Sequence, residues 1–154
     1  MKQEITKPGE NGAKFSVDSW LPAKNIHMKI LGIGLDIVET ARIAKSLEKF
    51  GDRFLHRVFC DGEIAYCQSM KYPHTHFAAR FAAKEAVSKT FGTGIGKSIG
   101  WRDIEVCKKE SGEPFCVLHG GAKALAEKIG ATGVLISLSH TEHYAAANAV
   151  LVGD

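Results

Sequence analysis

The sequence predicts a single domain of the α+β class, with an antiparallel sheet packed with one long helix and several short ones. The predicted elements come in the order strand, several helices, β-hairpin, helix and β-hairpin, and not as alternating strand and helix units. The length of 154 residues suits one domain. A hydrophobic content of 45% and a charged content of 24% are ordinary for a globular protein with its own core.

The organised part of the chain is expected to begin at Met28. Residues 1–27 mix Lys, Glu, Pro, Gly and Asn with little apolar periodicity, so we expect a mobile N-terminal extension there and the domain over residues 28–154. Residues 29–38 are rich in Ile, Leu, Val and Gly and predict a strand. The following "ETARIAKSLEKFG" has apolar residues at helical spacing and predicts a helix that stops at Gly51.

The strongest helical pattern is "THFAARFAAKEAVSKTFG", which follows two short helical pieces, "DRFLHRVF" and "DGEIAYCQSM". Its many alanines favour a helix, with Thr75 as the expected N-cap and Gly92 as the expected end. The core candidates on this helix are Phe77, Phe81 and Phe91.

The second half of the chain is expected to be mostly strands. Alternating apolar residues on both sides of Ser111 and Gly112 predict a β-hairpin. "GGAKALAEKIGA" predicts a short amphipathic helix that ends at Gly130. "VLISLSH" and "HYAAANAVLV" predict two strands joined by "HTEH".

Composition excludes several classes of protein. A net charge of +3 is too small to indicate bulk nucleic-acid binding. The four cysteines form no C-x-x-C pair, which argues against a zinc knuckle or a thioredoxin-like site and favours reduced, packed thiols. No apolar run is long enough to cross a bilayer and the N-terminus lacks a secretory pattern, so a cytoplasmic protein without membrane contact is expected.

The stretch "FGTGIGKS" at residues 91–98 suggests a phosphate-binding loop, but it is one residue short of a Walker A motif. A Walker A loop also follows a strand and opens a helix, whereas this one follows the long helix and precedes a strand. An NTPase is therefore disfavoured. One glycine would suffice to cap the helix, and three in five residues would let backbone amides approach an anion closely.

Two carboxylates and several basic residues are candidates for a site. Asp36 lies in an apolar strand, where it either faces solvent, helps to start the next helix, or binds a cation. Glu85 lies four residues before Lys89, which is the spacing of an ordinary surface pair. Two such carboxylates could also hold one Mg²⁺ together with phosphate oxygens, with Arg80, Lys84 and Lys89 binding the remaining phosphate charge.

The histidines give a weaker signal. His140 and His143 in "SHTEH" lack the spacing of a zinc site, so a structural or ligand-contacting histidine is the preferred interpretation. His74 and His76 stand at the start of the long helix without a partner that the sequence identifies.

Three stretches together resemble a known family. "GIGLDIVE", "RFAAKEAVSKTFGTGIG" and "SLSHTEHYAAA", in this order, are similar to the motifs of the holo-acyl-carrier-protein synthases, the short 4′-phosphopantetheinyl transferases. The resemblance covers about Met28 to Val152. It implies the fold of that family, a trimer with active sites between protomers, and the use of Mg²⁺.

The resemblance also implies a reaction. Members of the family transfer 4′-phosphopantetheine from coenzyme A to a serine of apo acyl carrier protein, in fatty acid biosynthesis, and release adenosine 3′,5′-bisphosphate. The carrier serine needs a base, which would be Glu85 or a metal-bound water oriented by Asp36. Lys89 would assist the leaving phosphate.

The resemblance assigns roles to residues of this chain. Asp36 and Glu85 match the two metal-binding carboxylates of the family. Asp36, Glu85 and Lys89 together match its catalytic residues. The positions implied around coenzyme A are Arg80, Lys84, Lys89, Gly92, Thr93, Gly94, Gly96 and His140. The phosphates that the glycine loop contacts would then belong to coenzyme A.

The same resemblance implies an acidic protein partner. The basic residues of the first two predicted helices are Arg42, Lys45, Lys49, Arg53 and Arg57. In the simplest interpretation they are solvated surface charges. With the resemblance, they become candidate contacts for acyl carrier protein. Asp61 departs from the pattern, because some relatives have a basic residue there. A non-catalytic protein that binds coenzyme A remains a third hypothesis, and the pair of carboxylates argues against it.

Overall fold

The computed structural model describes residues 28–154, so the predicted N-terminal extension lies outside the described residues. The elements, in chain order, are β1 (Lys29–Glu39), α1 (Thr40–Phe50), α2 (Asp52–Val58), α3 (Asp61–Gln68), α4 (Pro73–Thr90), the 3₁₀ helix η2 (Trp101–Asp103), β2 (Ile104–Lys108), β3 (Pro114–Leu118), α5 (Gly120–Lys128), β4 (Ala131–His140) and β5 (Tyr144–Gly153). Both predicted hairpins and all the predicted helices are present. The α+β prediction is therefore confirmed.

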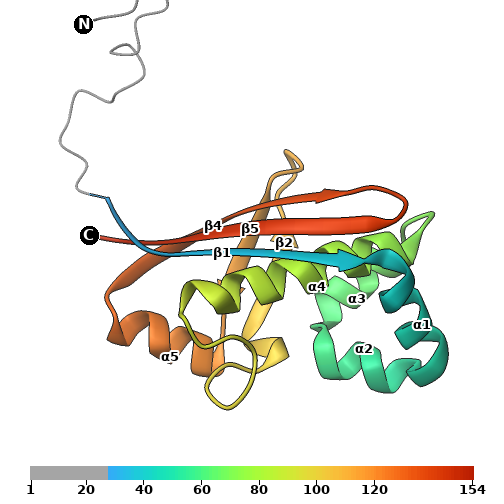
Figure 1. Cartoon of the computed structure of the whole chain (residues 1–154), viewed down its shortest axis with the longest axis horizontal. Coiled ribbons are helices and arrows are strands. Elements are labelled where there is room, and N and C mark those ends of the chain that lie inside the picture. The colour runs from blue at the N-terminus through green and yellow to red at the C-terminus, as the bar shows by residue number, and fades with distance from the viewer. Residues whose placement is uncertain (1–27) are drawn as a thin grey trace, which may run out of the picture.

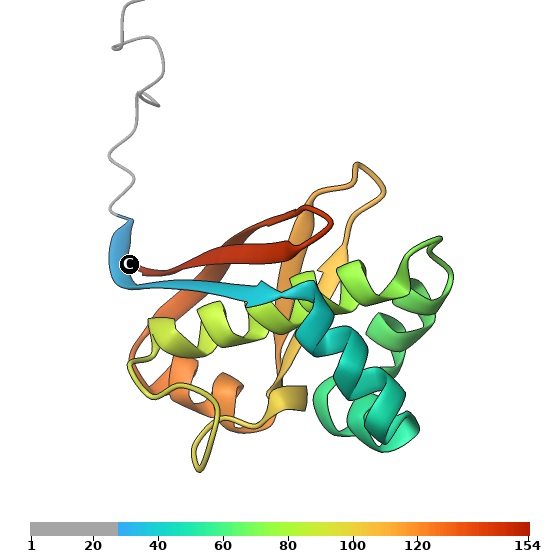
Figure 2. The same ribbon diagram turned by 45° about the vertical axis from the view of Figure 1, so that its right-hand side comes forward.

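The three long strands form one antiparallel sheet in the order β1-β5-β4, and β2 and β3 form a separate two-stranded ladder. The central strand β5 pairs along its whole length with β1, from Lys29 opposite Gly153 to Glu39 opposite Tyr144. The register of this pair shifts between Ile30 and Gly32. Figures 1 and 2 show α4 running along one face of the three-stranded sheet, with α1, α2 and α3 gathered beyond one end of it.

Helix α4 is the centre of the molecule, because it contacts all three strands of the sheet as well as α1, α3 and β2. Small residues make this possible: its alanines are almost fully buried, and Phe77 is 2% exposed. Phe81 and Phe91 are only partly buried, although both pack against the core. The prediction that Phe81 and Phe91 are core residues is therefore confirmed in part.

The start of α4 differs from the prediction. The helix begins at Pro73 with Tyr72 as its N-cap, and the Thr75 hydroxyl donates to the Tyr72 carbonyl at 2.9 Å instead of capping the helix. Proline suits the first helical position, because its fixed φ is helical and no donor is lost there. The end is as predicted, with Gly92 at φ 73° directly after the C-cap.

Two glycines let β1 lie directly on α4. A Cβ on Gly32 would stand 2.0 Å from the carbonyl oxygen of Thr90, and a Cβ on Gly34 would stand 1.9 Å from that of Ala86. No larger residue fits at either position without separating the strand from the helix. This close approach sets the position of the residue two places further along β1, which is Asp36.

The other face of β1 is open in the described chain. Ile33, Leu35 and Ile37 alternate along the strand and are 65–68% exposed, and Leu135 on β4 is 57% exposed. Alternation places Asp36 on the opposite face, toward α4. The sheet therefore presents an uncovered apolar surface on the side away from the helix.

No helix within residues 28–154 is both long and apolar enough to cross a bilayer.

We predict that Gly34→Ala lowers the free energy of unfolding by roughly 1–3 kcal/mol, because the added Cβ overlaps the Ala86 carbonyl and forces β1 away from α4. Urea denaturation measures this change. Gly133→Ala is the control, since a Cβ there meets the Val152 side chain at an ordinary 3.6 Å. Equal stability of both variants would show that the strand and the helix are not in close contact.

Candidate active site

The structure brings Asp36 of β1 and Lys89 of α4 into direct contact. The Lys89 ammonium donates to Oδ1 of Asp36 at 2.8 Å and to the carbonyl of Leu35 at 2.9 Å. The Asp36 side chain is 17% exposed and the Lys89 side chain 46% exposed. Asp36 is therefore neither a solvent-facing residue nor a helix cap, and Lys89 bridges the strand and the helix.

Glu85 lies one turn before Lys89 on the same side of α4. Its pKa is raised, first by burial and then by the negative charge of Asp36, while Lys89 lowers it. The two carboxylates are thus close enough to repel each other. The expected surface pair between Glu85 and Lys89 is not among the ion pairs of the described residues, because Lys89 turns to Asp36 instead.

The chemistry of this donor set suits a divalent cation that is shared with a ligand. Mg²⁺ typically takes one or two protein carboxylates and completes its coordination with phosphate oxygens and water. Within residues 28–154 no group of three or more His, Cys, Asp and Glu side chains is placed to hold a metal ion. Asp36 and Glu85 therefore fit an ion that arrives with a phosphorylated substrate better than they fit a permanently bound one.

The glycine loop begins three residues after Lys89. Gly92 and Gly94 have φ angles of 73° and 67°, and a Cβ on either of them or on Gly96 would meet no atom of the described residues within 4 Å. The Thr93 hydroxyl lies near the Gly94 carbonyl at 3.3 Å. The loop leads to η2 and not to a helix N-terminus, so the context that a Walker A loop requires is absent from this region.

Arg80 and His140 lie together, but not with the carboxylates. They line a cavity of about 190 Å³ between α3, α4, β4 and the β2–β3 hairpin. Arg80 precedes Glu85, the carboxylate on the same helix, by five residues, which is roughly 7.5 Å along the helix axis and about 140° around it. One ligand could touch both places only if it is elongated or if a second subunit supplies one of them.

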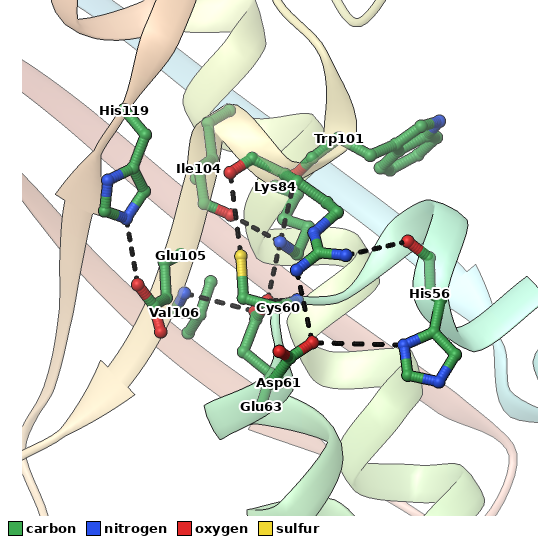
Figure 3. A network of polar contacts seen from close by, with 11 residues as sticks. His56, Cys60, Asp61, Glu63, Lys84, Trp101, Ile104, Glu105, Val106 and His119 are labelled. Carbon is green, nitrogen blue, oxygen red and sulfur yellow. Dashed lines mark hydrogen bonds and ion pairs between the residues drawn. The ribbon is translucent and has the colours of Figure 1, made fainter.

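Lys84 does not lie where the sequence-based prediction needs it. Its side chain is 0% exposed, and its ammonium forms an ion pair with Glu63 of α3 at 2.7 Å. It also donates to the carbonyls of Trp101, at 3.0 Å, and Ile104 (Figure 3). With no exposed atom, Lys84 cannot reach a phosphate in this arrangement, so its predicted coenzyme A contact is corrected to a structural role.

Glu63 completes this buried network. It accepts the backbone N–H of Cys60 at 2.8 Å and that of Val106 at 3.1 Å, in addition to the Lys84 ammonium. A buried ion pair is tolerated when such extra hydrogen bonds satisfy it. Figure 3 shows how this pair joins α3, α4 and the start of β2.

The predicted partner-binding residues are all exposed and line two neighbouring cavities. Arg53 and Arg57 line one of about 590 Å³, and Arg42 and Lys45 line one of about 280 Å³. Both cavities also share two aromatic side chains, Phe54 and Phe81. The surface formed by α1 and α2 thus combines positive charge with apolar hollows.

Asp61, the departure from the family pattern, lies at the edge of that surface. It accepts from the guanidinium of Arg102 at 3.2 Å and lies 3.9 Å from His56 (Figure 3). Its negative charge is therefore already paired within the chain.

The cysteines behave as packed thiols. All four are free, and burial raises the pKa of Cys67 and of Cys116 to about 12. Neither thiol is a nucleophile at neutral pH.

Sequence analysis missed three members of the cavity that contains Arg80 and His140: Tyr66, His76 and Lys108. His76 had a usable signal, because a residue four places before Arg80 lies on the same face of the helix. Tyr66 and Lys108 come from other elements, and no spacing in the sequence relates them to Arg80.

Comparison with known proteins gives the class to which this fold and site belong. The model of the 4'-phosphopantetheinyl transferase superfamily matches residues 32–148. The chain is 49% identical over 122 residues to a holo-[acyl-carrier-protein] synthase of Koribacter versatilis, covering 79% of this chain and 98% of the relative. It is 47% identical over 121 residues to a synthase of the same name from Chlamydia trachomatis, again covering 79% and 98%.

Solved structures agree. The holo-[acyl-carrier-protein] synthase of Neisseria meningitidis matches with a TM-score of 0.74 and 33% identity, covering 80% of this chain and 98% of that one. The Helicobacter pylori enzyme, solved in complex with coenzyme A, matches with a TM-score of 0.69 and 34% identity, covering 77% and 98%. The chain belongs to the 4'-phosphopantetheinyl transferase superfamily and, within it, to the holo-[acyl-carrier-protein] synthases. It is an enzyme of that family.

We predict that Lys84→Met lowers the free energy of unfolding by roughly 3–5 kcal/mol, because Glu63 is left as an unpaired buried carboxylate. Adding Glu63→Gln should recover part of this loss by removing the charge. Urea denaturation of the two variants tests both statements. If Lys84→Met alone is as stable as the wild type, the ion pair between Lys84 and Glu63 is not buried.

Proposed function

We propose that this protein transfers 4′-phosphopantetheine from coenzyme A to a serine of apo acyl carrier protein, in a reaction that requires Mg²⁺ and releases adenosine 3′,5′-bisphosphate. The observation that carries the proposal is the convergence of Asp36, Glu85 and Lys89 at one point between β1 and α4. The relatives named above act on acyl carrier protein by name, and one was solved with coenzyme A. The product would serve fatty acid biosynthesis, as the resemblance implies.

Asp36 and Glu85 are the side chains that would hold the ion, which, when bound, offsets charge on the diphosphate of coenzyme A. The raised pKa of Glu85 supports this role, since a nearby cation would relieve its repulsion with Asp36. The carrier serine also needs a base, and Glu85 and a water oriented by Asp36 are the candidates at this site.

Lys89 would neutralise charge on the leaving phosphate. Its ammonium is exposed enough to reach a ligand and is held at the site by Asp36 and the Leu35 carbonyl. The glycine loop follows at once, and its open backbone at residues 92–96 would admit phosphate oxygens next to Lys89. Arg80 and His140 would bind another anionic group of coenzyme A in their cavity.

The surface of α1 and α2 supports docking of an acidic carrier. Arg42, Lys45, Arg53 and Arg57 are exposed there, and the hollows beside them are lined by aromatic rings. Charged rims steer an oppositely charged partner, and apolar hollows accept its hydrophobic side chains.

The uncovered face of the sheet supports assembly into the trimer that the resemblance implies. Ile33, Leu35 and Ile37 form an apolar row that would be buried against another subunit. A shared active site, which the resemblance also implies, would then combine the carboxylates of one subunit with the Arg80 cavity of its neighbour.

The proposal is tested by incubating the protein with apo carrier, coenzyme A and Mg²⁺ and recording the intact mass of the carrier. A gain of one phosphopantetheine that a chelator prevents is the expected result. Glu85→Gln should lower the rate roughly hundredfold or more, because it removes the charge that binds the ion.

The fold of Glu85→Gln should be intact and its thermal stability near neutral pH slightly higher than that of the wild type. The sign follows from the raised pKa: ionised Glu85 opposes folding, and the variant removes this penalty above that pKa. Coenzyme A binding without any change in carrier mass would favour the non-catalytic hypothesis and remove the proposed reaction.

Docking is tested separately by its dependence on salt. Raising NaCl from 50 to about 300 mM should increase the KM for the carrier several-fold with less effect on kcat, because exposed charges are screened. Arg53→Ala should weaken this dependence, and Lys128→Ala on the exposed surface of α5 should not. If the KM for the carrier does not change with salt concentration, the α1–α2 surface does not bind the carrier electrostatically.

A further inference from the structure

The cavity beside the first turns of α4 is positively charged and has no acidic lining. Its polar side chains are Tyr66, His76, Arg80, Lys108 and His140, and no Asp or Glu of residues 28–154 contributes to its wall. Its volume of about 190 Å³ leaves room for a small anionic group.

The burial of Arg80 in this cavity is energetically unfavourable without a bound ligand. Its side chain belongs to a residue that is 5% exposed, and its Nε has no hydrogen-bond partner among the described residues. The guanidinium lies 4.1 Å from the ring centre of Tyr66, and Lys108 lies 5.2 Å from the same ring. A cation–π contact offsets only part of the cost of burying a cation, so the site lacks a negative partner.

His76 contributes the second unusual feature, because its ring lies 5.1 Å from that of His140 and 6.0 Å from that of Tyr66. The groups that face it are Arg80 on its own helix, Tyr66 on α3, Lys108 on β2 and His140 on β4. The pKa of His76 is lowered by burial and then by His140, Arg80 and Lys108. An anion in the cavity would oppose the effect of these three neighbours on the pKa of His76.

We infer that His76 is a further substrate-binding residue, which together with His140 receives the terminal phosphate monoester on the ribose of coenzyme A and binds it more tightly when protonated. This inference rests on the proposed function, because it assigns a specific part of that substrate to the cavity. A monoester carries nearly two negative charges at neutral pH, whereas each phosphate of the diphosphate bridge carries one. Four side chains that are or can become positive therefore match the monoester better.

The experiment is calorimetric titration of the full chain with coenzyme A and with 3′-dephospho-coenzyme A, at pH 6.5 and pH 8. His76→Phe keeps a ring against Tyr66 and His140 but removes both nitrogens. It should weaken coenzyme A binding roughly tenfold at pH 6.5, and less at pH 8, since it loses a hydrogen bond to a charged group. Binding of the dephospho analogue should not change.

The ligand's own titration is common to wild type and variant, so the ratio of their dissociation constants isolates His76. His74→Phe is the matched control, because His74 lines the adjoining cavity with Tyr72 and not this one. His76→Gln is the second variant, which should show the loss of pH dependence if the phenylalanine disturbs the fold.

Equal losses for both ligands, or a ratio that is the same at the two pH values, would overturn the inference. Carrier modification that proceeds normally alongside such a result would leave the proposed function intact. Conversely, His76-dependent binding of coenzyme A by a protein that never modifies a carrier would support the inference and refute the transfer reaction.

Discussion

The contact between β1 and α4 is the constraint on which the rest of the molecule depends. Glycines at positions 32 and 34 bring the strand backbone against the helix, and Lys89 then reaches both the Leu35 carbonyl and Asp36. Neither element alone contains the site. The strand supplies one carboxylate, the helix supplies the other carboxylate and the lysine, and the missing side chains of two glycines allow them to meet.

Helix α4 also organises the remaining functional surfaces. Its first half contributes Arg80 and His76 to the charged cavity, and its end leads into the glycine loop. A helix that is buried on nearly every side is fixed in position by its neighbours. The groups that it carries therefore keep their spacing, as a binding site requires.

Much of this fold could be predicted from the sequence because its signals are local. The alanine-rich pattern of α4 and the turn at Ser111 and Gly112 depend on neighbours in the chain, and the structure confirms both. The prediction of Thr75 as the N-cap is wrong because Pro73, two residues earlier, favours the first helical position more strongly. The burial of Lys84 cannot be predicted from the sequence because its partner, Glu63, lies on another helix, and no spacing rule connects the two.

The sequence predicts the candidate site less completely than the fold. Motif resemblance names Asp36, Glu85 and Lys89 as candidates, and the structure brings these three side chains together. The resemblance could not distinguish an exposed basic residue from a buried one, since burial is a property of the folded chain. It also could not find Tyr66 and Lys108, which meet Arg80 only through tertiary packing.

The irregular pairing between Ile30 and Gly32 has a consequence for how β1 tolerates change. Side chains of a strand alternate between its faces, so a slip of one residue after Gly32 would turn Asp36 outward and drive Leu35 against the helix. An extra or missing residue before Gly32 can instead be absorbed where the ladder is already uneven. Length variation in this strand should therefore be harmless at its beginning and destructive from Gly32 onward.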